Sequence, residues 1–347
     1  MMNFKTVLRL LLYSFVLSIN AQEKKDNLLV SKSNNGLKFE NSNKSIQLNT
    51  GGRIINDIGV FSLNNEAEIN GYDLYSKNGN EFRRIQLYTS GELFQNYNYK
   101  IDVNFAEGKV TLMDTYLTLK NIPSLGNIRV DYFFESFRLD AITSHKYTTF
   151  TEKSLPTSII PVRNTDVMIF NSTKNKRFSW QVTYFNGANK LTSDKQKSNG
   201  EYTATSRIAG SVIKTTNNLL HLGFSHSYRK QQSDQIFQFK VPPETHTANS
   251  YLNSNIENVT NVNLFNIETV LFHNSITLQT EYTYSTIKSS IENNHFNSYY
   301  SQLSYFISGE KKTFRNSIQN FGRIKPNKNL GTNGFGALEL KELTMKI

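Results

Sequence analysis

Polar and apolar side chains alternate along most of this chain with a period of two residues. From Tyr97 to Phe105 every odd position is apolar or aromatic and every even position is polar or charged. Residues 276–285 repeat this pattern, and residues 45–61 follow it more loosely. Because successive side chains of a strand point to opposite faces, these segments predict strands with one apolar and one polar face. No segment of comparable length shows the periodicity of a helix.

The alternation predicts about thirteen strands, each around ten residues long. They cover residues 45–61, 82–93, 97–105, 110–120, 127–134, 166–171, 178–186, 202–211, 218–229, 262–271, 276–285, 297–308 and a last segment that starts at Gly334. Short turns separate some strands, and long polar connections separate others, at 62–80, 135–165, 187–200 and 230–260. Tilted strands of this length can cross a bilayer, and outer-membrane barrels combine short turns with long loops.

Aromatic residues make up 12% of the chain, and many of them lie at the ends of the predicted strands, as in the girdles of membrane barrels. The candidates for such a girdle are Phe82, Phe94, Tyr97, Phe105, Tyr282, Tyr284, Tyr299 and Tyr305. We therefore predict an all-β fold, a transmembrane antiparallel β-barrel. A soluble β-sandwich also alternates, so a secreted or periplasmic β-rich binding protein is the alternative.

Residues 1–21 have the features of a secretory signal peptide. Lys5 and Arg9 precede an apolar stretch of about ten residues, which is too short to span a bilayer as a helix. We expect cleavage before Gln22, a periplasmic N-terminal segment at 22–44 and a barrel domain at 45–347. The chain has no cysteine, which excludes disulfides, thiolate metal sites and a cysteine nucleophile.

Short motifs spread in order over roughly residues 45–341 resemble the phosphate-selective porin O and P family. They include Glu81–Arg84, Leu112–Leu117, Phe133–Leu139, Thr149–Ser154, Pro161–Asn164, Leu220–Ser225, Tyr299–Tyr305, Gly322–Pro326 and Gly336–Leu340. The resemblance implies a homotrimeric porin in the outer membrane of a Gram-negative bacterium, contacting outer-membrane lipid and inserted by the outer-membrane assembly machinery. It implies small phosphate-like anions as solutes. The region Asn20-Ala21-Gln22 also resembles the leaders of exported Bacteroidetes proteins.

The chain departs from the family pattern at several positions. The family usually has glycine where Asp131 and Asp166 stand, a basic residue at Phe134 and a proline-like position at Ser136. Its members resemble barrels of about sixteen strands, so at about 25 residues per strand and connection about 75 further residues would be needed. They also end on an aromatic residue, whereas this sequence stops at Ile347. We therefore expect a C-terminal truncation, and a non-functional truncated porin is a further alternative.

The charges on the inner wall of a water-filled barrel select the ions that pass. Strand parity places five cations on the polar face, because their apolar neighbours fall on the other face: Arg53, Arg84, Lys100, Arg129 and Arg207. Guanidinium groups match phosphate and carboxylate geometry, so such a wall favours anions. Alternatively, these cations only pair with acids of the same face, such as Asp102, Asp131 and Glu281. By the same parity Arg83 faces lipid, at the headgroup level.

The densest basic tract lies at residues 311–328 and contains no acid. It holds Lys311, Lys312, Arg315, Arg323, Lys325 and Lys328. In the resembled family long basic segments fold into the lumen, so this tract is a candidate constriction. The loop 135–165, with Arg138, Lys146, Lys153 and Arg163, is a second candidate. A solvated turn, or a patch against lipid phosphates, is the alternative reading of the tract.

Other kinds of site find little support in the sequence. His221 and His226 lie five residues apart on one predicted strand, hence on opposite faces, so we expect no metal site. No nucleophile, phosphate-loop or dinucleotide motif is present, so we expect no cofactor and no enzyme, although a barrel hydrolase would need only Ser, His and an acid at one rim. The formal net charge of +11 is spread over the strands of an exported chain, which disfavours nucleic acid as a partner.

Overall fold

The computed structural model describes residues 29–33, 36–60, 78–159, 163–186, 201–231, 237–241, 252–315, 317–331 and 334–346. The expected signal peptide, 1–21, lies outside these residues, so it stays a prediction. The strands are β1 (Leu29–Ser33), β2 (Gly36–Glu40), β3 (Ile46–Gly59), β4 (Gly79–Leu93), β5 (Tyr97–Asn104), β6 (Thr111–Ile122), β7 (Gly126–Phe134), β8 (Arg163–Ser172), β9 (Phe178–Asn186), β10 (Tyr202–Lys214), β11 (Asn218–Lys230), β12 (Phe237–Val241), β13 (Leu252–Ile256), β14 (Val259–His273), β15 (Ile276–Ser289), β16 (Asn293–Phe306), β17 (Phe314–Arg315), β18 (Asn320–Phe321) and β19 (Glu339–Lys346). The short helices are η2 (Ala106–Gly108), α3 (Leu139–Ile142) and η3 (Leu155–Ile159).

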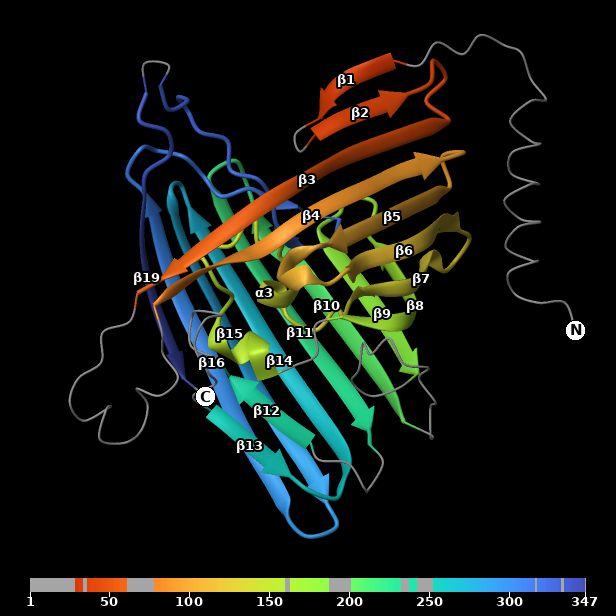
Figure 1. Cartoon of the computed structure of the whole chain (residues 1–347), viewed down its shortest axis with the longest axis vertical. Helices are drawn as coiled ribbons and strands as arrows, with labels where there is room; N and C mark the ends of the chain where they lie inside the picture. The colour runs from red at the N-terminus through yellow and green to blue at the C-terminus, as the bar shows by residue number, and fades with distance from the viewer. Residues whose placement is uncertain are drawn as a thin grey trace, which may run out of the picture.

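One antiparallel sheet of fifteen strands forms most of the described structure. Its strand order follows the chain from β1 to β11, then β14, β15, β16 and β19, so nearly every strand pairs with its neighbours in sequence. The remaining strands form two small pairs, β12 with β13 and β17 with β18. Figure 1 shows that the sheet curls around an interior in which α3 lies.

All thirteen strands expected from the alternation are present, with bounds that differ by a few residues from the expected ones. The all-β antiparallel prediction is therefore confirmed. The sequence reading missed β1 and β2, which lie within the segment 22–44 and join the sheet through β3. It also missed the short pairs inside the connection 230–260 and inside the basic tract. These strands are too short for a period of two to stand out.

The two faces of the sheet differ in polarity as the alternation predicts. On β15 the side chains of Thr277, Gln279, Glu281, Thr283 and Ser285 are buried on the inner face. On the outer face large apolar side chains are exposed, among them Leu87 (62%), Ile267 (55%) and Val182 (50%). A soluble sandwich buries its apolar face, so this arrangement contradicts the binding-protein alternative and suits an outer face in lipid. None of the helices in the described residues has the length and apolar run needed to cross a membrane.

Aromatic side chains at the strand ends also face outward. Seven of the eight girdle candidates are exposed: Phe82, Phe94, Tyr97, Phe105, Tyr282, Tyr299 and Tyr305. Tyr284 is half-buried. An exposed aromatic ring at a strand end is suited to the boundary between hydrocarbon and water. Tyr282 and Tyr299, however, lie in the middle of β15 and β16 and pair with each other, so these two are not strand-end residues.

Two segments fold into the interior and pack on the inner wall. The first, here called the inner loop (residues 135–159), carries α3 and η3, and the second is the basic tract (311–328). Leu139 of the inner loop and Phe321 of the tract share a buried apolar cluster with Val270 of β14. The amide of Asn320 also donates to the backbone oxygen of Ile142, at 2.9 Å. The two segments therefore support each other against the wall.

A bulge changes the orientation expected for Arg83. The register between β3 and β4 shifts between Ile55 and Asp57, so β4 carries one extra residue there. An extra residue reverses the parity of the side chains that follow. Arg83 accordingly points inward, where it pairs with Glu152 of the inner loop at 3.0 Å. The expectation that Arg83 faces lipid headgroups was wrong.

Asp131, where the resembled family has glycine, adopts a backbone φ of +87°. This value lies in the left-handed region, which glycine adopts without strain and other residues rarely occupy. The positive φ of β7 at this position thus explains why the family usually has glycine there.

The outer face generates a first prediction. Replacing Ile267, in the middle of β14, by lysine should lower the free energy of unfolding in lipid vesicles by roughly 2–4 kcal/mol, because the ammonium group would lie at mid-membrane. Replacing Ile276, which is exposed at the first position of β15 beside a short turn, by lysine should cost only about 0–1 kcal/mol. Guanidinium titrations of the two variants measure the difference. Equal costs would contradict the placement of this face in lipid.

Candidate functional site

A cavity of about 460 Å³ lies between the inner wall of β3–β9 and the two inward segments. Six of its lining side chains are cationic: Arg53, Lys100, Arg129, Lys146, Arg163 and Arg315. Two are acidic, Asp102 and Asp114. The wall contributes four of the six cations, while Lys146 comes from the inner loop and Arg315 from the tract. This cavity is the strongest candidate for a functional site, because it gathers an excess of positive charge in a confined space.

Asp114 on β6 holds two of these cations in place. It accepts a hydrogen bond from Lys100 Nζ at 2.7 Å and one from Arg163 Nε at 2.8 Å. Lys100 also lies 3.2 Å from Asp102. On β3, Arg53 donates to the side-chain oxygen of Gln86. Part of the wall charge is therefore balanced by acids, and part of it is not.

Two of the guanidinium groups stack on aromatic rings. The Arg129 guanidinium carbon lies 3.9 Å from the centre of the Tyr116 ring, and Arg129 Nε donates to Thr118 at 3.1 Å. The Arg163 guanidinium carbon lies 3.6 Å from the centre of the Phe134 ring. A guanidinium stacked on a ring keeps its N–H groups in the plane, free to point sideways. The rings therefore fix the direction in which these cations present their donors.

A second cavity, of about 320 Å³, adjoins the first and shares His145 with it. Arg84 lines this second cavity and lies 3.0 Å from His145 Nε2. Burial lowers the pKa of His145 far below its ordinary range, and the charges of Lys153 and Arg84 act in the same direction. His145 is therefore neutral at physiological pH.

Burial also affects Lys153 of the inner loop. It lowers the pKa of Lys153 to about 8, with Arg163 and Arg84 acting in the same direction and Asp140 opposing them. The Lys153 ammonium donates to the backbone oxygen of Ala141 and lies 4.9 Å from the centre of the Phe134 ring. Lys153 thus carries its charge only in part once the pH exceeds about 8.

The basic tract places its cations in different surroundings. Arg315 lines the main cavity and donates to Asn320 at 3.0 Å. Lys312 is buried, pairs with Glu339 at 3.1 Å and donates to Thr149, and burial lowers its pKa. Lys311 is exposed and donates to Asn217, in a short turn, at 2.6 Å. Arg323 and Lys325 are exposed outside the main cavity.

Arg207 faces inward but is closed off from the cavity. Its guanidinium donates to both carboxylate oxygens of Glu268 and, at 3.0 Å, to the backbone oxygen of Gln319 in the tract. His221 lies 2.7 Å from the same carboxylate. Glu268 reaches both partners by lying across Gly223, where a Cβ would come within 2.4 Å of its Oε1. Arg207 therefore anchors the tract to the wall.

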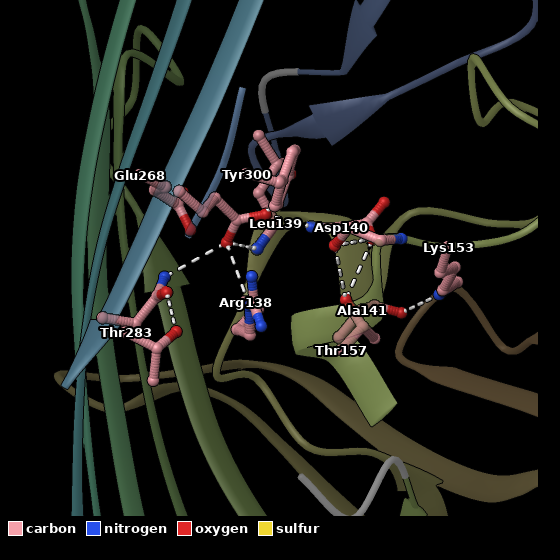
Figure 2. Close-up of polar contacts among 12 residues, drawn as sticks. Arg138, Leu139, Asp140, Ala141, Lys153, Thr157, Glu268, Thr283 and Tyr300 are labelled. Carbon is pink, nitrogen blue, oxygen red and sulfur yellow. Dashed lines mark hydrogen bonds and ion pairs between the residues drawn. The ribbon is translucent and has the colours of Figure 1, made fainter. Parts of the chain in front are cut away.

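Buried carboxylates also fasten the inner loop to the wall. Glu135 of the loop accepts from Arg229 of β11 at 2.6 Å and from Ser227 at 3.0 Å. The second attachment joins Glu281 of β15 to the start of α3, where Figure 2 shows Leu139 and Asp140 beside Tyr300. The backbone N–H groups of Leu139 and Asp140 donate to the two oxygens of Glu281, at 3.0 and 2.8 Å. Further along, Asp140 accepts from Ser154 and Thr157, each at 2.9 Å, and so closes the loop on itself.

The structure thus brings together four of the ten residues that the sequence reading proposed for an anion pathway: Arg53, Lys100, Arg129 and Arg315. Arg84 lies next to them, Arg207 and Lys312 are buried in ion pairs, and Lys311, Arg323 and Lys325 lie elsewhere. The reading missed the aromatic residues of the cavity, because it assigned rings to the membrane boundary. Tyr116 could have been found, since it shares the parity of the inward Asp114.

Among the described residues, no group of three His, Asp or Glu side chains is placed to hold a metal ion. His221 faces inward, whereas His226 stacks on the outward Phe265 with ring centres 4.7 Å apart. The expectation that these two histidines lie on opposite faces is confirmed.

Sequence comparison connects the chain to known proteins. The model of the family described as phosphate-selective porin O and P matches residues 48–342. Porin O of Pseudomonas aeruginosa is 21% identical over 337 residues, which cover 87% of this chain and 74% of that protein. An uncharacterized protein of Caulobacter vibrioides is 24% identical over 276 residues. That match spans 76% of this chain but only 54%, about half, of the Caulobacter protein.

Comparison of structures finds outer-membrane proteins at low similarity. A loop-deletion mutant of OmpT, an outer membrane protein of Vibrio cholerae, aligns with a TM-score of 0.49 and 10% identity, covering 76% of this chain and 78% of that chain. An anion-selective porin from Comamonas acidovorans aligns with a TM-score of 0.49 and 9% identity, covering 76% and 75%.

The surroundings of Lys153 generate a second prediction. Its amine should lose the proton with a midpoint near pH 8, which NMR of 13C-dimethylated lysines can follow. Replacing Arg84 by glutamine should raise the midpoint toward the ordinary value, because a repelling charge is removed, whereas Asp140→Asn should lower it further. An unshifted midpoint in the unmodified chain would contradict the buried position of the amine.

Proposed function

Because this chain belongs to the phosphate-selective porin O and P family of Gram-negative outer-membrane porins, we propose that it lets small phosphate-like anions diffuse through the interior of its sheet. Porins are channels rather than enzymes. The solute class is suggested by the description of the family, and the cation-lined cavity supports it. The six cations against two acids around one cavity of about 460 Å³ are the observation that carries the proposal.

Positive charge in a narrow aqueous space lowers the energy of an anion and raises that of a cation. The space is confined by the inner loop and the basic tract, so solutes pass within a few ångströms of the charged groups. Arg129, held on Tyr116, and Arg163, held on Phe134, present donors of fixed direction, which suits the tetrahedral oxygens of phosphate. We propose that these two segments form the constriction of the channel.

The further properties of the protein follow from the same proposal. The apolar outer face would contact outer-membrane lipid, and the outer-membrane assembly machinery would insert the sheet. The signal peptide at 1–21 would direct export, and the resemblance to the family implies a homotrimer. Assignment of the chain to Bacteroidetes and its C-terminal truncation stay predictions.

A planar-bilayer experiment tests the anion proposal. In asymmetric KCl the reversal potential should show a preference for chloride over potassium. Replacing Arg129 or Arg315 by glutamine should reduce the chloride-to-potassium permeability ratio by roughly twofold each, because each removes one cation from the cavity. Lys109→Gln is the matched control, since Lys109 is exposed outside the cavity and its loss should leave the ratio unchanged. A preference for potassium, or equal effects of all three changes, would overturn the proposal.

Asp114 allows the opposite change in charge. Asp114→Asn keeps the shape of the side chain but removes the charge that balances Lys100 and Arg163. The permeability ratio should rise by about twofold, and inorganic phosphate should block the chloride current at lower concentration. If the ratio falls or phosphate block weakens, these two cations do not face the permeating ion.

A further inference from the structure

We propose that Glu281 is a positioning residue that holds the inner loop against the wall and thereby sets the width and the selectivity of the cavity. The inference rests on the proposed channel function for its electrical consequences. Its structural part concerns only how the side chain of Glu281, on the wall, caps the first residues of α3, which belongs to the inner loop.

The start of α3 needs acceptors from outside the loop. The first N–H groups of a helix have no partner within the helix and are usually capped by the side chain just before it. In α3 that position is Arg138, which has no oxygen to offer and makes no capping hydrogen bond. Glu281 supplies both oxygens instead, to the N–H groups of Leu139 and Asp140. A helix of four residues could not persist without such an external cap.

The wall itself also holds the carboxylate of Glu281 in position. Asn266 of β14 donates to Glu281 Oε2 at 3.1 Å, and Thr283 donates to Asn266 at 2.8 Å. From β16, Tyr300 donates its hydroxyl to Glu281 Oε1. Three neighbouring strands therefore fix the direction of one acceptor group.

Arg138 makes this attachment sensitive to the charge of Glu281. Arg138 is fully buried, and its Nε lies 3.7 Å from Glu281 Oε2. Its neighbours Phe137 and Leu139 enter two different buried apolar clusters, which hold the backbone on both sides of Arg138. Without Glu281 the docked loop would keep these apolar contacts but would bury a cation and two N–H groups without acceptors. An uncompensated buried charge is strongly destabilising, so the loop would leave the wall.

The attachment lies directly beside the cavity. The cavity is lined by Ile142, the last residue of α3, and by Ser144, His145, Lys146 and Tyr147, which follow α3 within a few residues. The cap on Leu139 and Asp140 therefore fixes where these lining side chains stand. Release of α3 would widen the passage and move Lys146 away from the other cations.

A cysteine reporter tests the attachment directly. The chain has no cysteine, so Ala141→Cys would carry the only thiol, at a position that is buried in the docked loop. In refolded, heat-modifiable protein in detergent, its reaction with a charged methanethiosulfonate should be at least tenfold faster when Glu281 is also replaced by alanine. Glu281→Gln keeps one acceptor oxygen and should give a smaller acceleration.

Glu92→Gln is the matched control. Glu92 is a wall carboxylate on β4 whose ion pair, at 2.8 Å, is with Lys120 of β6 rather than with either inward segment. The reporter should therefore react at nearly the rate of the otherwise unchanged chain. Equal acceleration by Glu92→Gln and Glu281→Gln would overturn the proposal, because general loosening of the wall would then explain both.

Single-channel recording gives a readout that a loss of folding yield alone would not change. Channels carrying Glu281→Ala should conduct about twofold more and show a lower chloride-to-potassium ratio, with Glu281→Gln in between. Unchanged conductance and selectivity, or an unchanged reporter rate, would overturn the positioning role. If the reporter rates follow the expected order while the unmodified chain shows no anion preference, the proposed function fails and the attachment stands.

Discussion

Charges that face the interior of this sheet are stabilised by opposite charges brought from distant parts of the chain. Arg229 of the wall binds Glu135 of the inner loop, Glu281 binds the start of α3, and Arg207 binds Glu268 together with the basic tract. A buried charge without a partner costs several kcal/mol, so these contacts determine where the inward segments can lie. The cavity exists because the two segments are held at these points and cover only part of the wall.

The sequence predicted the sheet well, because its cause is local. Alternating residues such as those at 97–105 can bury one face only as a strand, so thirteen strands could be located from the period alone. The inward direction of Arg53, Lys100 and Arg129 follows from the same parity. Positions that depend on a single local irregularity could not be predicted. The bulge beside Asp57 turned Arg83 inward, and no residue pattern announced it.

The candidate site was predictable only in part, because its composition depends on tertiary pairing. The alternation cannot tell a cation that faces water from one that is balanced by an acid on another strand. Arg207 has the same sequence signature as Arg129, yet it is buried against Glu268, 61 residues away. Tyr116 and Phe134 were not among the expected site residues, yet guanidinium groups stack on both of their rings in the cavity. Phe134 stands where the resembled family has a basic residue, and here Arg163 places a cation at the same point.

The spacing between Glu281 and its partners has a consequence for assembly. Leu139 follows β7, but its acceptor lies 142 residues later, on β15. Contacts between residues so far apart in sequence form late, since most of the chain must be ordered before they can close. The inner loop can accordingly be held at α3 only once β15 has joined the sheet. The wall that carries the acceptor is thus a precondition for the narrowing of the cavity by this loop.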